Sequence, residues 1–367
     1  MENRYVNATN SLLMLAMAAA LAGCSESDAP APAEPAGNAE PVAEIVEPAA
    51  ESTVEDTNPF FEEWTLPFGM PPFDRIDDDH FIPAMERGME DHLAEIEAIA
   101  TSDEAPTFEN TIVAMEKSGQ LLGKVTRVFF NLVGADTNDQ RQAIQREMSP
   151  RLTAHQDAIT LNPDLFARID TLYRQRDELG LDAESHRLLE ETHRSFVRSG
   201  AQLDDAQKER LREINGELAR LGTEFSQNVL REVNDSAIVV DTVEELDGLS
   251  EAQIQGAAAE AADRGLEGRY VLTLMNYSSQ PQLSSLTNRD VRRRLMEASL
   301  TRGARGNEFD NREIVARMLT LRAERAGLLG YETHADFVLE ERTAGSVSAV
   351  AEMHGQLAPA AVANARK

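Results

Sequence analysis

Residues 203–234 read LDDAQKERLREINGELARLGTEFSQNVLREVN, and no other stretch of the chain has so clear a helical pattern. Apolar residues recur there every three or four positions, nearly as in a heptad repeat. They are Leu211, Ile214, Leu218, Leu221, Phe225 and Val229. The polar residues from Lys208 to Glu217 fall on the other face, which the pattern assigns to solvent. With a second helix over Ser185–Ser199 and a break at Gly200, the stretch predicts a helical hairpin of structural rather than catalytic importance.

The same 3.6-residue period extends over most of the chain after Asp79. It predicts a helix from about Pro83 to Ala100 with Asp79 as its cap, and another that starts after Thr107 and continues to Leu132. A third helix is expected over Arg141–Leu161, bent at Pro150 because proline removes a backbone hydrogen bond. Further helices are predicted at Leu283–Thr301, Asn311–Leu329, Ala335–Arg342 and from Val347 onward.

Two short runs depart from this period. Ser236–Asp241 and Arg269–Leu274 are rich in β-branched residues and bounded by turn formers, which predicts two strands. A helix is expected between them, over Glu251–Asp263. The sequence therefore indicates a mainly α fold with one small strand pair.

The first 57 residues have the pattern of an export signal and a tether. The apolar run Leu12–Ala22 is too short to span a bilayer and suits a signal peptide over residues 1–23. It ends in Leu-Ala-Gly-Cys24, which resembles the bacterial lipobox, so Cys24 is expected to carry a lipid anchor to the membrane. Ser25 favours an outer-membrane lipoprotein facing the periplasm. Residues 24–57, rich in Pro, Ala and Glu, are expected to form a disordered tether.

The composition makes nucleic acid an improbable partner. The net charge is −29, from 64 acidic and 35 basic residues, and such a chain repels phosphate backbones. The acidic residues are spread along the chain, which indicates a solvated surface; a bias toward basic peptides is the weaker alternative. A monomer is expected, with residues 58–367 as its helical part.

No catalytic or metal-binding constellation can be assigned from spacing. A helical zinc site needs two histidines four residues apart, and none of the seven histidines is so placed. His186 and His193 are seven apart, and Glu190 forms an E-x-x-H pair with His193, but a second copy of that motif is missing. We interpret them as a surface charge cluster. The loop Gly303–Gly306 lacks the context of a phosphate-binding loop and is predicted to be a turn between helices.

Several blocks of sequence, in order, carry a resemblance to a known family. Residues 58–60 (NPF), 66–73 (LPFGMPPF), 108–119 (FENTIVAMEKSG), 196–201 (FVRSGA), 274–281 (LMNYSSQP) and 321–331 (LRAERAGLLGY) are similar to segments of thimet-oligopeptidase-like zinc metallopeptidases. The likeness is strongest to the bacterial peptidyl-dipeptidase branch and covers residues 58–367. It implies a helical, two-lobed enzyme with a deep channel that admits only short peptides.

The resemblance also implies one zinc, held by the two histidines of H-E-x-x-H and a downstream glutamate, with the motif glutamate as general base. That motif does not occur in the 367 residues, so no catalytic or metal-binding residue is transferred to this chain. We expect an N-terminal portion of a peptidase that releases C-terminal dipeptides, truncated before the catalytic motif and inactive alone. The alternatives are an oligoendopeptidase of the same family and a non-catalytic helical lipoprotein that binds peptides or a partner.

Overall fold

The structure is a computed structural model that describes residues 58–274 and 280–367. All of these residues belong to one unit of the chain, Ser52–Lys367. The signal peptide, the tether and the lipid anchor at Cys24 lie outside the described residues, and so does part of the block 274–281. These expectations remain predictions.

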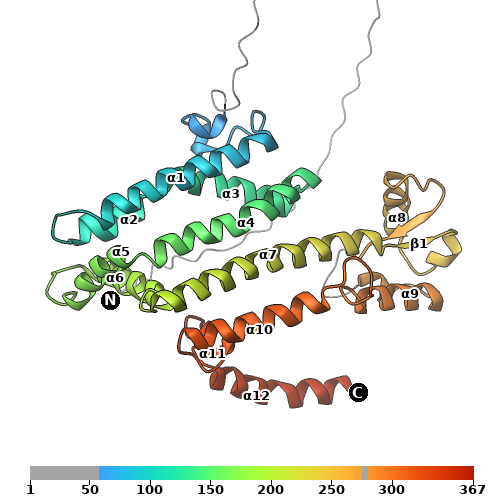
Figure 1. The fold of residues 1–367 in the computed structure, drawn as a ribbon. Helices are drawn as coiled ribbons and strands as arrows, with labels where there is room; N and C mark the ends of the chain where they lie inside the picture. The colour runs from blue at the N-terminus through green and yellow to red at the C-terminus, as the bar shows by residue number, and fades with distance from the viewer. Residues whose placement is uncertain (1–57, 275–279) are drawn as a thin grey trace, which may run out of the picture. The chain divides into compact units, whose positions relative to one another are not determined.

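The long helix α7 (Asp205–Asp235) lies between α4 (Asp139–Thr160) and α10 (Arg312–Leu328), as Figure 1 shows. Asp204 caps its N-terminus by accepting a hydrogen bond from the backbone N–H of Gln207. Its apolar seam forms one core with α10. The fully buried members of that core are Ile214, Leu221, Ile314 and Leu321.

The predicted hairpin paired the helix over Ser185–Ser199 with the helix over residues 203–234, and this pairing is wrong. The chain does break at Gly200, whose φ is +95°, but α6 (Ala183–Arg198) packs mainly on α5 (Pro163–Arg174) and not on α7. The reason is burial: Leu189 and Phe196 of α6 share an apolar cluster with α5, whereas the seam of α7 faces α10.

The sequence suggested that the polar face of α7 is solvated, but some of its residues contact neighbouring parts of the chain. Lys208 is buried, and its Nζ donates to the backbone carbonyl of Leu161 at 3.3 Å. Arg210 pairs with Glu324 of α10 at 2.7 Å. The polar residues of this helix therefore help to place its neighbours.

Near the N-terminus of the described region, two expectations need correction. Asp79 does not cap α1 (Phe81–Ala100), because a 3-10 turn capped by Asp77 precedes that helix. The segment capped by Thr107 is not one helix. It forms a π-helical turn (Phe108–Val113), α2 (Ala114–Lys117) and α3 (Gln120–Ala135).

The helices α2 and α3 are separated at Gly119, whose φ of +66° is a left-handed conformation that favours glycine. The helix α5 was not predicted from the sequence. Its signal was present in Asn162-Pro163: the Asn162 side chain accepts hydrogen bonds from the N–H groups of Asp164 and Leu165, with proline in the first turn. Further along, α4 continues through Pro150 without interruption.

The strand pair is confirmed. Strands β1 (Ile238–Val240) and β2 (Tyr270–Leu272) are antiparallel, with Val239 opposite Val271. The helix α8 (Glu251–Asp263) packs on β2, and α9 (Arg289–Leu300) packs on β1. The helix predicted from Leu283 starts later, because Pro281–Ser284 forms a 3-10 turn and Asn288 caps α9.

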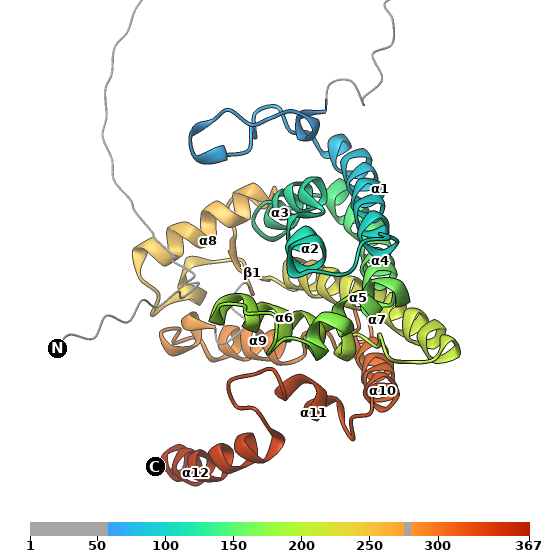
Figure 2. The same cartoon turned by 90° about the vertical axis from the view of Figure 1, so that its left-hand side faces the viewer.

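The chain then continues through α10, α11 (His334–Leu339) and α12 (Val347–Ala365), all expected from the sequence. No residue of α12 is buried, and Figure 2 shows it beyond α11. Across the described ranges, no helix is both long and apolar enough to cross a membrane. The mainly α fold with one small sheet is thus confirmed.

Candidate functional site

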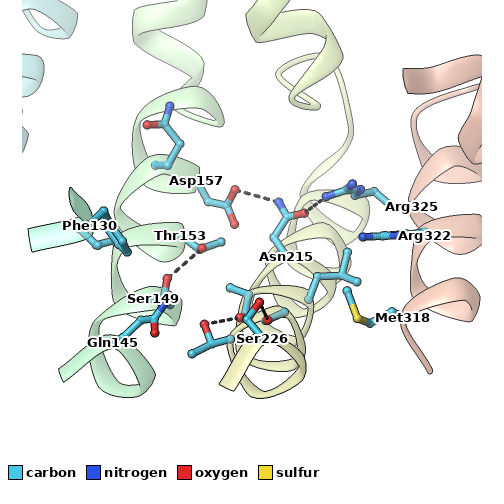
Figure 3. Close-up of a pocket in the computed structure, with 16 residues that line it drawn as sticks. Phe130, Gln145, Ser149, Thr153, Asp157, Asn215, Ser226, Met318, Arg322 and Arg325 are labelled. Atoms are coloured by element: carbon cyan, nitrogen blue, oxygen red, sulfur yellow. Dashed lines mark hydrogen bonds between the residues drawn. The ribbon is translucent and has the colours of Figure 1, made fainter. Parts of the chain in front are cut away.

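A groove runs between the three central helices, α4, α7 and α10. Its volume is about 750 Å³, and Phe130 of α3 contributes to one wall. Figure 3 shows the side chains that face it. The apolar part of its lining includes Phe130, Leu152, Leu218 and Met318, and the uncharged polar part includes Gln145, Ser149, Thr153, Thr223 and Ser226. We call this cavity the central groove.

Three side chains from the three helices form a hydrogen-bonded relay at one end of the central groove. Asn215 of α7 donates from Nδ2 to Asp157 Oδ1 of α4 at 2.9 Å. Its Oδ1 accepts from Arg325 Nη1 of α10 at 3.3 Å. The amide therefore lies between a carboxylate and a guanidinium and makes one hydrogen bond with each, as Figure 3 shows.

The carboxylate of this relay is buried, and the hydrogen bonding of the relay is incomplete. Asp157 is only 6% exposed, and burial raises the pKa of its carboxyl. Its Oδ2 and the Nε of Arg325 have no hydrogen-bond partner among the described residues. An unpaired buried polar atom is costly, so each one needs an explanation, such as a bound water or ion or a functional role.

Arg322 lies one helical turn before Arg325 and lines the same groove. Its guanidinium makes no hydrogen bond or ion pair with any residue in the described ranges. Burial lowers the pKa of Arg325, and the positive charge of Arg322 lowers it further. Burial likewise lowers the pKa of His334, with Arg322 and Arg325 adding to the effect. This end of the groove is electropositive although the chain as a whole is acidic.

The local sequence explains this placement. Arg322 and Arg325 are three residues apart, so they project from the same side of α10. Leu321 and Ile314 anchor the helix against α7. Chemically, the arrangement offers guanidinium donors for an anion and apolar surface beside them, but no activated nucleophile. Sequence reasoning missed all four polar residues, although Arg322 and Arg325 lie within the quoted block 321–331.

A second polar cluster links α1, α4 and the break before α3. His92 Nδ1 lies 3.0 Å from His155 Nε2, and His92 Nε2 lies 3.1 Å from Ser118 Oγ. Ser118 donates its single hydroxyl hydrogen to the carbonyl of Met115 at 2.7 Å. It must therefore accept from His92, and His92 must accept from His155.

His155 is buried, and burial together with the neighbouring His92 lowers its pKa to about 4. In the unfolded chain the pKa of a histidine is near 6.5. Between pH 6.5 and 4, the unfolded chain therefore binds a proton at this position more readily than the folded chain does. Stability contributed at pH 7 is therefore lost as the pH falls through this window. When the pH is lowered from 7 to 5, the free energy of unfolding should fall in both proteins. We expect the fall to be about 2 kcal/mol smaller in His155→Gln than in the unsubstituted chain. Urea unfolding at both pH values measures this.

The control for that experiment is His354→Gln, because His354 is exposed on α12. It should lose as much stability as the unsubstituted chain over the same pH interval. An identical pH dependence for His155→Gln and the unsubstituted chain would show that the buried pair does not couple protonation to folding.

The histidines singled out in the sequence are not a plain surface cluster. His193 stacks on Tyr173 with a centroid distance of 3.8 Å, and its Nε2 lies 3.2 Å from Asp170 Oδ1. It belongs to the α5–α6 interface, because its side chain is only 13% exposed. His186 is more exposed and lies 3.4 Å from Asp177. The loop Gly303–Gly306 is a turn between α9 and α10, as predicted.

The described residues do not fit a zinc ion. In the ranges 58–274 and 280–367, no group of three His, Cys, Asp or Glu side chains is placed to hold a metal. The central groove contributes one carboxylate and no histidine. His92 and His155 lie side by side, and their facing ring nitrogens are hydrogen-bonded to each other.

Comparison with known proteins gives consistent results. Residues 282–367 match the profile of Peptidase family M3. Over 304 residues, or 83% of this chain and 45% of the relative, the sequence is 38% identical to dipeptidyl carboxypeptidase of Escherichia coli (strain K12). It is 40% identical to dipeptidyl carboxypeptidase of Salmonella typhimurium over 305 residues, again 83% and 45% of the two chains. The chain belongs to peptidase family M3.

More distant M3 relatives include oligopeptidase A of Haemophilus influenzae, 26% identical over 79% of this chain and 43% of the relative. The chain spans about half the length of the curated relatives it matches. The M3 profile covers α10 and hence Arg322 and Arg325 of the central groove. Peptidases of family M3 are in general zinc-dependent.

The predicted localisation is wrong. The relatives are named dipeptidyl carboxypeptidase and oligopeptidase A, and they are not named as outer-membrane lipoproteins. The expectation rested on Leu12–Ala22 and Cys24, which resemble a lipobox over only a few positions. A short apolar run followed by one cysteine is a much weaker signal than a match over 83% of the chain.

Proposed function

We propose that this chain serves in a zinc peptidase of family M3 that releases dipeptides from the free C-terminus of short peptides. The observation that carries the proposal is its identity of 38% and 40% to two dipeptidyl carboxypeptidases. The oligopeptidases A of bacteria match at 25–26%. This difference favours dipeptide release over cleavage within the peptide.

We assign to this chain the binding of peptide rather than its hydrolysis. A zinc ion lowers the pKa of its bound water from 15.7 to about 7, and the central groove offers no group that replaces this activation. We therefore assign zinc to the complete enzyme and none to these 367 residues. The purified chain should bind no stoichiometric zinc and cleave no peptide.

A chimera tests the proposed activity. In E. coli dipeptidyl carboxypeptidase, the stretch that aligns with this chain is replaced by the chain's own residues. We expect the zinc-loaded chimera to release a dipeptide from an N-acetylated hexapeptide with a free carboxylate. The same hexapeptide with a C-terminal amide should be cleaved at least tenfold more slowly, because a peptidyl-dipeptidase requires the free C-terminus. Mass spectrometry of the products measures both reactions.

The controls separate the alternatives. Equal cleavage of acid and amide at internal bonds would favour an oligoendopeptidase instead, the second candidate supported by the oligopeptidase A matches. A folded chimera that binds zinc and leaves both peptides intact would contradict the proposal. Zinc-dependent hydrolysis by the purified chain alone would overturn the division of roles. A non-catalytic peptide-binding function, which the central groove also supports, would instead be indicated by peptide binding without hydrolysis in both the purified chain and the chimera.

A further inference from the structure

We propose that Arg322 in the central groove binds the free carboxylate of a short peptide, with Arg325 beside it as a second, less accessible charge. This inference rests on the proposed function, and it assigns the recognition of the free C-terminus to a named residue. It concerns binding only, so it can be tested in the purified chain without zinc or hydrolysis.

The first observation is an unpaired guanidinium in an acidic protein. The net charge is −29, and two other arginines of α10 have carboxylate partners: Arg312 lies 2.7 Å from Asp310, and Arg317 lies 2.7 Å from Glu217. Arg322 has no such partner in the part of the chain that the structure describes. It is also partly shielded from solvent, which makes an ion pair with a ligand stronger than one on an open surface.

The second observation is the state of Asp157, the single acidic residue among those that line the groove. This carboxylate does not neutralise Arg322, because its Oδ1 accepts from Asn215, which in turn accepts from Arg325. Asp157 is more than nine-tenths buried, and its Oδ2 has no partner among the described residues. Figure 3 shows this side chain directed between α4 and α7, into the groove. The relay therefore occupies Arg325 and leaves Arg322 available.

Charge balance then selects the ligand. The groove holds one carboxylate against two guanidiniums, so one further negative charge would balance it. A guanidinium can donate two parallel hydrogen bonds to a carboxylate, which fixes its orientation as well as its position. Phe130, Leu152 and Met318 provide apolar surface along the same groove. That combination suits a short peptide with an apolar C-terminal segment better than a small inorganic anion.

The test measures binding by calorimetry. The ligands are an N-acetylated hexapeptide of Ala, Leu and Phe with a free carboxylate, and the same peptide as the C-terminal amide. We expect the unsubstituted chain to bind the acid at least tenfold more tightly than the amide. Arg322→Gln should bind the acid about as weakly as the amide, and it should no longer distinguish the two. Arg322→Lys should retain part of the preference, because it keeps the charge but not the forked geometry.

Arg317→Gln is the matched control, because it removes a guanidinium from the same helix outside the groove lining. It should keep the preference for the acid. Arg322→Gln breaks no hydrogen bond or ion pair with a described residue, so its thermal unfolding should match that of the unsubstituted protein. A variant at Arg322 that still prefers the acid, or an unsubstituted chain that binds both peptides equally or neither, would overturn the inference.

Two further arms distinguish neighbouring explanations. Inorganic phosphate at ten times the peptide concentration should leave most of the peptide bound; complete displacement would assign the site to small anions and overturn the peptide assignment. In the chimera, Arg322→Gln should raise KM for the acid substrate while leaving most of kcat. A chimera without activity but with intact acid-selective binding by the chain would reject the proposed function and keep this binding site.

Discussion

Gly248→Ala is expected to destabilise the protein by about 4 kcal/mol, from backbone strain and a steric clash together. Gly248 has a φ of +95°, in the left-handed region that residues with a Cβ rarely adopt. A Cβ built at this position would lie 2.0 Å from the carbonyl oxygen of Ser285. The backbone fixes the position of the added Cβ, and the obstacle is a backbone oxygen, so no side-chain rotation can relieve the contact.

The two segments cannot easily move apart. The backbone N–H of Thr287 donates to the carbonyl of Asp247 at 2.9 Å, and the Thr287 hydroxyl donates to the carboxylate of Asp247 at 2.6 Å. On either side, Leu246 and Leu286 are buried in the same apolar cluster. Opening this contact would therefore expose the core that supports β1, β2, α8 and α9.

Gly268→Ala is the matched control for this substitution. Its φ is +83°, but nothing lies within 4 Å of an added Cβ, so only the backbone cost of about 1–2 kcal/mol is expected. Urea unfolding followed by circular dichroism compares the two. If Gly248→Ala costs no more than Gly268→Ala, the close approach to Ser285 does not constrain the fold. The fluorescence of Trp64, which packs in a different cluster, shows whether the unit around Gly248 unfolds separately.

The elements of this fold could largely be predicted because their signals are local. The seam of α7, the helical start after Thr107 and the break at Gly200 each depend on a few consecutive residues, and the helix predicted around Glu251 to Asp263 is α8, with those bounds. The predictions were wrong where a partner decided the outcome. The polar face of α7 contacts α10 through Arg210 and Glu324, which no periodicity within α7 could reveal.

The central groove could not be predicted for the same reason. Asp157, Asn215 and Arg325 come from three helices separated by 58 and 110 residues in sequence. Each has an ordinary helical context, and each would be read singly as a solvated residue. The relay becomes visible only when the helices are placed together. Among the arginines of α10, Arg322 is the one without a hydrogen bond or ion pair to a described residue, which is a property of the fold and not of the sequence.

Glu232→Ala is expected to cost about 3 kcal/mol, because it removes the charge partner of Arg305 and leaves the backbone N–H of Gly303 without its acceptor. Glu232 is 0% exposed near the end of α7. One of its oxygens accepts a short hydrogen bond from the backbone N–H of Gly303. The other lies 3.4 Å from Arg305 Nε. Glu232 thus holds the turn between α9 and α10 against α7, and α10 carries Arg322.

Glu217→Ala, on the same helix, is the control that separates the effect of burial from the effect of the ion-pair distance. Glu217 pairs with Arg317 at 2.7 Å, closer than the pair at Glu232, but its side chain is 30% exposed and that of Arg317 is 45% exposed. An exposed pair of this kind contributes at most about 1 kcal/mol. Urea unfolding at pH 7 should therefore rank the two substitutions opposite to the ranking of their ion-pair distances. Equal losses would mean that the contact between the 303–306 turn and α7 contributes no more to stability than a surface ion pair. In that case Arg322 would owe its position to the apolar seam of α7 and α10 alone.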